Sequence, residues 1–148
     1  MTKAYKYSIL YFLAFSLLLI ISGTMLFEHK IGFSPQSVNE YYMGNSQEYI
    51  PAKTPSGILK IVLPHIFAFG LFTMVILHFL VFTKERNSFK SRLLIYLTFI
   101  SAFLEISTPF LIIGGVEFFA YFKIISFVLF ESLILYSAWL LFRSIMQD

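Results

Sequence analysis

The fold is decided by two apolar runs in the second half of the chain, LLIYLTFISAFLEISTPFLII at residues 93–113 and FFAYFKIISFVLFESLILYSAWLLF at residues 118–142. Two further apolar runs precede them, at residues 7–27 and 58–82. A helix needs about 20 residues to cross the hydrocarbon core of a bilayer, and each run reaches that length. Because a segment in lipid must satisfy its backbone hydrogen bonds internally, all four runs are predicted to be transmembrane helices.

The composition points to one integral membrane domain over residues 1–148, in contact with the lipid bilayer. Of the 148 residues, 58% are hydrophobic and only 13% are charged, whereas a soluble domain averages about 25% charged residues. There is no cysteine, which excludes disulfides, thiolate metal sites and thiol catalysis. No nucleophile motif or phosphate-binding loop is visible. We therefore predict no catalytic residue and no metal site, and we expect a protein that is not an enzyme.

The basic residues are shared unevenly between the two sides of the predicted membrane. Seven fall on one side: Lys3, Lys6, Lys84, Arg86, Lys90, Arg92 and Arg143. Four fall on the other side: Lys30, Lys53, Lys60 and Lys123. Basic residues that flank apolar runs set topology, so they do not indicate a nucleic-acid partner. Their bias predicts a multi-pass protein of a bacterial inner membrane with cytoplasmic N- and C-termini. The simplest architecture is an all-α, antiparallel, up-down-up-down four-helix bundle.

The polar segment 28–57 contains the pattern of a short helix. Ser34 followed by Pro35 is typical of an N-cap and a first helical residue, and Gly44 is typical of a helix end. Val38 and Tyr42 lie four residues apart and share one helix face. We expect a short periplasmic interfacial helix over the mouth of the bundle. The pair at 114–115, Gly-Gly, predicts a tight turn between the third and fourth spans.

Two glutamates in the apolar runs are the main candidates for a buried polar site. Glu105 lies 12 residues after Leu93 and Glu131 lies 12 residues before Arg143, so both are predicted about 18 Å from the cytoplasmic edge. Carboxyl groups at such depth are costly and usually face protein or water. Glu105 shares a predicted helix face with Thr98, Ser101 and Thr108. Pro109 lacks an N–H and should free the carbonyl of Glu105.

The histidines suggest a cofactor. His65 follows Pro64, and Met25 is predicted at the same depth. A b-type haem held by His65 and Met25, or by two copies of His65 across a homodimer, is one hypothesis. A quinone beside His65 or His78 is another. The alternative is that His65 only hydrogen-bonds a backbone carbonyl freed at Pro64.

Three functional hypotheses follow. The preferred one is a small accessory protein or subunit that binds haem b or quinone through His65 and works with other respiratory or membrane subunits, or as a homodimer. The second is a proton- or ion-conducting element that uses Glu105, Glu131 and His78. The third is a purely structural scaffold in which the two glutamates hold the third and fourth spans in register.

Three short motifs carry a resemblance: the segment from Ser34 to Gly44, the pair Pro64-His65 and the pair His78-Phe79. With them the chain resembles a group of small four-helix bacterial inner-membrane proteins with no established activity. The resemblance covers most of the chain and implies its fold and location.

Overall fold

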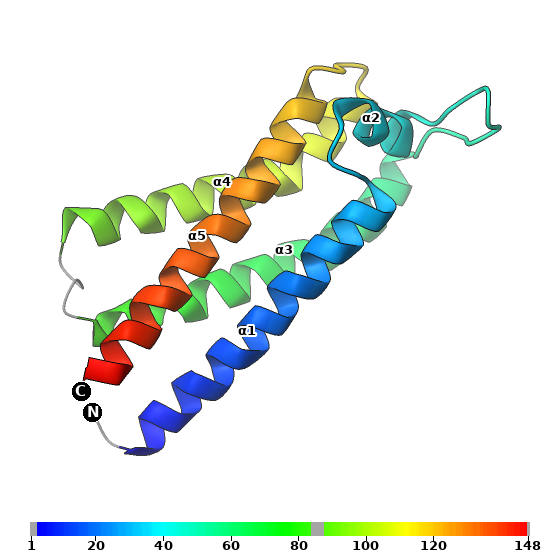
Figure 1. Ribbon diagram of the computed structural model, residues 1–148. Coiled ribbons are helices and arrows are strands. Elements are labelled where there is room, and N and C mark those ends of the chain that lie inside the picture. The colour runs from blue at the N-terminus through cyan, green and yellow to red at the C-terminus, as the bar shows by residue number, and fades with distance from the viewer. Residues whose placement is uncertain (1–2, 84–87, 148) are drawn as a thin grey trace.

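The computed structural model describes residues 3–83 and 88–147, which form helices and turns with no strand among them. The elements in chain order are α1 (Lys3–Lys30), α2 (Pro35–Met43), α3 (Pro55–His78), the 3-10 helix η1 (Phe79–Phe82), α4 (Phe89–Ile113) and α5 (Phe119–Gln147). The four long helices alternate in direction, so the N- and C-terminal ends lie at the same end of the bundle (Figure 1). The predicted all-α four-helix bundle is confirmed.

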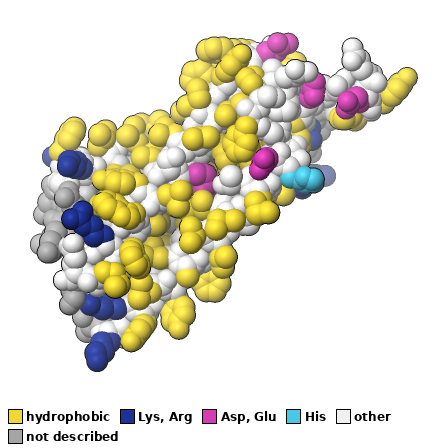
Figure 2. All heavy atoms as spheres, viewed as in Figure 1, with side chains coloured by type: hydrophobic (Ala, Val, Ile, Leu, Met, Phe, Trp, Pro, Cys, Tyr) yellow, Lys and Arg dark blue, Asp and Glu magenta, His cyan; other side chains and the backbone are white. Residues whose placement is uncertain are grey.

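The surface of the bundle is that of a membrane protein. All four long helices are apolar and long enough to cross a bilayer, and large side chains such as Phe15 (71% exposed) and Phe67 (74% exposed) point outward. Apolar side chains cover the visible face of the spans, and Lys and Arg side chains gather at the end that holds the termini (Figure 2). Soluble monomers do not expose such continuous apolar area. The chain is therefore a multi-pass membrane protein in contact with lipid.

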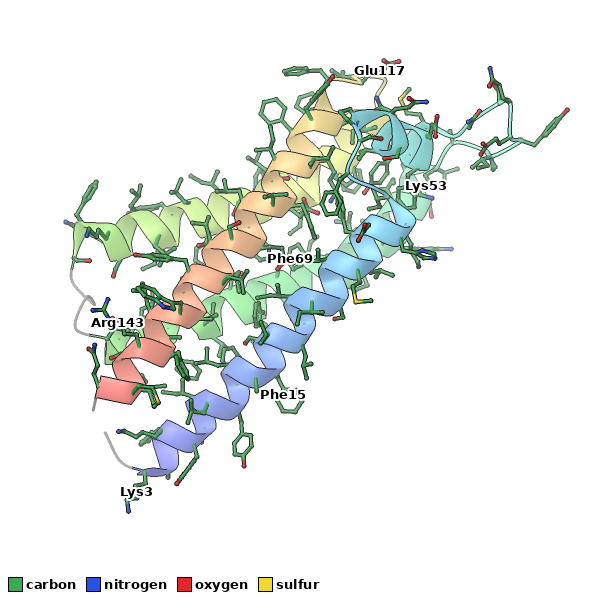
Figure 3. The ribbon with its side chains drawn as sticks, viewed as in Figure 1. Lys3, Phe15, Lys53, Phe69, Glu117 and Arg143 are labelled. Atoms are coloured by element: carbon green, nitrogen blue, oxygen red, sulfur yellow. The ribbon has the colours of Figure 1, made fainter. Side chains whose placement is uncertain are left out.

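The charged ends of the spans follow the predicted pattern. Lys3 and Arg143 lie at the end of the bundle that holds the termini, and Lys53 and Glu117 lie at the opposite end (Figure 3). Lys84 and Arg86, two of the residues behind the predicted topology, fall outside the described residues. The cytoplasmic position of the termini and the inner membrane stay predictions.

The helices begin earlier or end later than the apolar runs that predicted them. For example, α5 continues to Gln147, five residues beyond the predicted end of the fourth span. The reason is that an apolar run marks the part of a helix inside hydrocarbon, while the helix itself continues into the interface, where water also satisfies its end groups.

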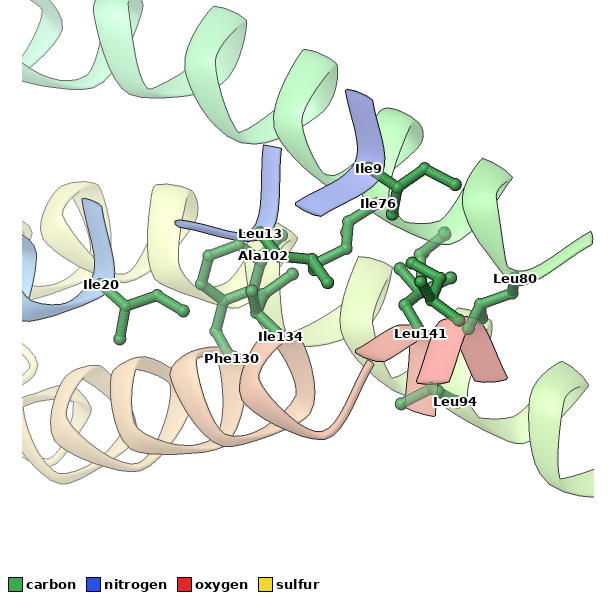
Figure 4. Close-up of a cluster of buried hydrophobic side chains, with 12 residues drawn as sticks. Ile9, Leu13, Ile20, Ile76, Leu80, Leu94, Ala102, Phe130, Ile134 and Leu141 are labelled. Carbon is green, nitrogen blue, oxygen red and sulfur yellow. The ribbon is translucent and has the colours of Figure 1, made fainter. Parts of the chain in front are cut away.

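Helix α5 lies at the centre of the packing, because it contacts α1, α3 and α4. A large apolar cluster fills the half of the bundle nearer the termini (Figure 4). A smaller one lies under α2 and contains Val38, Tyr42, Ile58, Val62, Ile112 and Ala120. The large cluster joins all four spans, and the smaller one joins α2 to α3, α4 and α5.

Helix α2 begins and ends where the sequence predicts. The Ser34 side chain accepts a hydrogen bond from the Ser37 backbone N–H at 3.0 Å, and Pro35 occupies the first helical position. At the other end Gly44 has φ +80°, a conformation that favours glycine. Val38 and Tyr42 form the buried face, as predicted, and that face packs on α4 and α5. The periplasmic location of this helix stays a prediction.

Candidate functional site

The polar face of α4 points into the bundle. Thr98, Ser101, Glu105 and Thr108 are all buried, as their spacing of 3, 4 and 3 residues predicts. Glu105, only 6% exposed, is the one ionisable side chain among these four. The spacing of polar residues in the sequence therefore predicted the buried side of α4 correctly for this glutamate.

The partners of the Glu105 carboxylate come from α5. Lys123 forms an ion pair and a hydrogen bond with Oε1. Ser126 Oγ donates a hydrogen bond to Oε2 at 3.0 Å. Both carboxylate oxygens thus have a donor, and the ion pair cancels the negative charge where water is excluded. A buried charge is tolerated when it is paired and hydrogen-bonded in this way.

The burial of Lys123 corrects the sequence analysis, which counted this residue among the charges at the membrane surface. Lys123 is only 5% exposed. Lys123 lies nine residues after Gly114, and Glu105 lies nine residues before Gly114. Because α4 and α5 run antiparallel from that turn, equal counts bring the two side chains to the same level. This symmetry about the turn is the signal that could have identified the pair.

The backbone of Glu105 takes part in the same contact. Lys123 Nζ donates a hydrogen bond to the Glu105 carbonyl oxygen at 2.9 Å. In an uninterrupted helix that carbonyl would accept from the N–H of residue 109, but Pro109 has none. The predicted free carbonyl is therefore present, and the lysine on the neighbouring helix occupies it. One ammonium group satisfies two acceptors of a single residue.

The hydroxyl groups on the polar face of α4 bond within their own helix. Thr98 donates to the Leu94 carbonyl at 2.7 Å, and Thr108 donates to the Leu104 carbonyl at 2.8 Å. Ser101 donates to the Thr98 carbonyl at 2.9 Å. None of these protons is directed at the Glu105 carboxylate. The face is polar, but its hydroxyls do not form a chain that leads to or from Glu105.

Glu131 has a different environment from Glu105. It is half-buried and lies eight residues further along α5 than Lys123, which is about 12 Å along the helix axis. Its Oε1 is 3.5 Å from the place where a Cβ on Gly23 would be, so the carboxyl group rests against α1. Glu131 therefore takes no part in the ion pair that Lys123 makes with Glu105, and the equal depth of the two glutamates stays a prediction.

Helix α2 covers the ion pair at the end opposite the termini. Tyr42 is buried under it, within the cluster that includes Ile112 of α4 and Ala120 of α5. Burial first, and then the negative charge of Glu105, raises the pKa of Tyr42. The Glu105 carboxylate is therefore close enough to α2 for its charge to act on a residue of the short helix.

His65 lies on the surface of α3. Its Nδ1 is 2.6 Å from the Ile61 carbonyl oxygen, and its ring meets Phe69 edge-on at 5.4 Å. The carbonyl that Pro64 frees is that of Lys60, four residues before the proline. The idea that His65 bonds the freed carbonyl is therefore wrong, because it bonds the next carbonyl along the helix.

The other two candidate cofactor ligands are on the surface as well. Met25 of α1 is 65% exposed, and His78 at the end of α3 is exposed. His65 and His78 are thirteen residues apart on one helix, about 20 Å along its axis, so they cannot bind one small group together. Within the described ranges, no group of three or more His, Asp or Glu residues converges as a metal site would require.

Comparison with known proteins gives a family. No curated protein and no solved structure matches the chain at a significant level. A family model described as a transmembrane helical domain matches residues 32–148, which include α2 and the three spans that carry His65, Glu105, Lys123 and Glu131. The chain therefore belongs to the Aq_1264_TM family of transmembrane helical domains.

Proposed function

We propose that the chain is a small, non-catalytic accessory subunit of a membrane assembly, which binds a redox cofactor, b-type haem or quinone, through His65. The observation that carries this proposal is the hydrogen bond between His65 Nδ1 and the Ile61 carbonyl oxygen. A carbonyl oxygen only accepts, so Nδ1 must hold the proton. The lone pair is then on Nε2, the nitrogen that is free to bind.

This arrangement is the one that ligand histidines use. A histidine that binds a metal usually donates its other N–H to a backbone carbonyl or a carboxylate, which fixes the tautomer and the ring orientation. The edge-on contact with Phe69 restrains the His65 ring further. An acceptor nitrogen in such a position also suits the hydroxyl group of a quinol.

The exposed position of His65 supports a shared site. The residues from 63 to 68 are all exposed, so a cofactor on this part of α3 would lie at the outer surface of the bundle. If the cofactor is a haem, the second residue that holds it would be Met25 of α1 or would come from a second copy of the chain or another membrane subunit.

The experiment is the absorption spectrum of the detergent-purified full chain, expressed with added haem precursor, together with analysis of its extracted quinones. A Soret band or a stoichiometric quinone that His65→Ala removes and His78→Ala retains supports the proposal. His78→Ala is a matched control because it replaces an exposed histidine of the same helix. A colourless protein without quinone contradicts it.

A structural scaffold is the second candidate, favoured by the closed network around Glu105. Both carboxylate oxygens and the freed carbonyl are occupied by Lys123 and Ser126, which is what a fixed link between α4 and α5 requires. If the double substitution Glu105→Gln and Glu131→Gln lowers only the thermal stability and leaves cofactor content and ion permeability unchanged, the scaffold is the better description.

The proton-conducting hypothesis has less support. A relay along Glu105, Glu131 and His78 needs groups between them that can pass a proton, whereas the α4 hydroxyls donate to carbonyls of their own helix. Proteoliposomes with a pH gradient test it directly. A proton flux that Glu105→Gln abolishes would restore this hypothesis.

A further inference from the structure

Glu131 is an ionisable group of the bundle that takes part neither in the proposed cofactor site at His65 nor in the pair of Glu105 and Lys123. It is the thirteenth of the 29 residues of α5 and so lies in the apolar part of the span. Lys123, the buried cation of the same helix, pairs with Glu105, as does the Ser126 hydroxyl. Within residues 3–83 and 88–147, no side chain donates a hydrogen bond to Glu131 and no cation pairs with it.

The carboxyl group lies in the seam between α5 and α1. The absence of a side chain at Gly23 gives it room, since its Oε1 is 3.5 Å from the place of a Cβ on that residue. The hydroxyls on either side of Gly23 are already bonded: Ser22 donates to the Leu19 carbonyl and Thr24 to the Ile20 carbonyl, each at 3.0 Å. The nearest part of α1 therefore makes space for the carboxyl group without supplying it a proton.

The seam opens to lipid. Leu26 of α1 and Val128 and Leu135 of α5 are exposed large apolar side chains close in sequence to Gly23 and Glu131. An unpaired carboxylate in such surroundings is costly, and the group avoids that cost by holding a proton.

We propose that Glu131 is a proton-binding carboxyl group that is open to lipid at the α1–α5 seam, and that it is chemically distinct from the closed pair of Glu105 and Lys123. The proposal does not depend on a cofactor at His65. A protonated carboxyl group at this position can react with a small apolar reagent that arrives through the lipid. The Glu105 carboxylate should not react, because it is buried and both of its oxygens accept hydrogen bonds.

Dicyclohexylcarbodiimide is the probe. The carboxyl O–H adds across one C=N bond of the reagent, the proton goes to nitrogen, and an acyl shift from oxygen to nitrogen gives a stable N-acylurea. No group leaves, so the protein gains the whole mass of the reagent. The reaction needs the protonated acid, which makes the adduct a report on both protonation and access from lipid.

The experiment treats the full chain in liposomes and locates the adduct by mass spectrometry of the intact protein and its peptides. We expect one adduct, at Glu131, that is lost in Glu131→Gln and retained in Glu105→Gln. Gly23→Leu should slow the reaction, because its side chain would cover the carboxyl group. Gly70→Leu is the matched control, since a Cβ at Gly70 has nothing within 4 Å.

Five results would overturn the proposal. The first four are an adduct at Glu105 instead of Glu131, no adduct at either residue, equal labelling of Glu131 by a water-soluble carbodiimide, and unchanged labelling in Gly23→Leu. Protection by excess Na⁺ would also contradict it, because the site would then bind a metal cation and not a proton. The Gly23 variant keeps Glu131 itself, so the test does not depend on the stability of Glu131→Gln.

Discussion

The ammonium group of Lys123 contacts Glu105 twice, at the carboxylate Oε1 and at the backbone carbonyl, the latter at 2.9 Å. The second contact exists because Pro109 leaves that carbonyl without its helical donor. A proline on α4 and a lysine on α5 thus cooperate to place one cation against two acceptors. This relationship fixes the relative height of the two helices that pack most extensively on each other.

Removing the lysine should destabilise the bundle strongly. In Lys123→Met the Glu105 carboxylate stays buried without its cation, and breaking a buried ion pair by removing one partner costs about 3–5 kcal/mol. Removing both charges in Lys123→Met with Glu105→Met should recover most of that loss, since apolar replacement of a buried pair is often neutral. Denaturant unfolding in detergent measures both values.

The control for this substitution is Lys60→Met, which removes an exposed lysine of α3. It should change the free energy of unfolding by less than about 1 kcal/mol. If Lys123→Met has an effect as small as that of the control, the ion pair does not hold α4 and α5 together.

The two helix-interior prolines should respond differently to alanine. An interior proline costs about 3 kcal/mol relative to alanine, so Pro64→Ala should stabilise α3, where no side chain in the described part of the chain donates to the freed Lys60 carbonyl. Pro109→Ala should gain much less, because the new N–H competes with Lys123 for the Glu105 carbonyl and a hydrogen bond to a charged donor is worth about 1.5–3 kcal/mol.

Lost packing also lowers the gain at Pro109, which is buried. Repeating Pro109→Ala in the Lys123→Met background separates the two effects, since only the hydrogen bond depends on the lysine. A gain that is the same in both backgrounds would show that the lysine contact with the carbonyl contributes nothing.

The sequence predicted the parts of the site that depend on one helix and missed those that depend on two. The spacing from Thr98 to Thr108 placed Glu105 inside, and the proline rule freed its carbonyl. Lys123 was misplaced because a lysine five residues inside an apolar run has a side chain long enough to reach the interface. Only the register of α4 against α5 about Gly114 shows that it turns inward.

The same limit explains the error at His65. The proline rule correctly names Lys60 as the residue with the freed carbonyl. The rule does not predict which carbonyl accepts the hydrogen bond from His65, because the acceptor depends on the rotamer of the His65 side chain. The hydrogen bond of His65 to the Ile61 carbonyl joins residues four apart, which is a common spacing within a helix. The sequence is compatible with this bond but does not show that it forms in place of a bond to Lys60.

The end of α2 should depend on glycine at position 44. With φ +80° and ψ 175°, Gly44 has a conformation that is nearly confined to glycine and that costs other residues about 1–3 kcal/mol. A Cβ there would also lie 2.6 Å from the Ala52 backbone nitrogen. Hydrogen exchange of Gly44→Ala should accelerate in residues 35–53 and stay unchanged in α5.

Gly70→Ala serves as the comparison for that glycine. Gly70 is inside α3, and a Cβ placed on it would have nothing within 4 Å apart from its own helix backbone, so alanine should stabilise the helix by about 0.5–1 kcal/mol. Faster exchange in Gly70→Ala, or unchanged exchange of α2 in Gly44→Ala, would contradict the expected difference between the two positions.

Tyr42 should report on the contact between α2 and the ion pair through its titration. Burial, then the charge of Glu105 and then that of Tyr41, raises the pKa of Tyr42 above its usual value of 10.0. A group whose folded-state pKa is raised contributes stability that is present below its unfolded pKa and is lost as the pH rises through its folded pKa. The bundle should therefore lose stability above about pH 10, and Tyr42→Phe should reduce that loss.

In a spectrophotometric titration of the nine tyrosines, Tyr42→Phe should remove the fraction that ionises at the highest pH. Glu105→Gln should move that fraction to lower pH, because it removes the second-largest cause of the shift while Tyr42 stays buried. A titration curve that Glu105→Gln leaves unchanged would mean that α2 does not sense the charge beneath it.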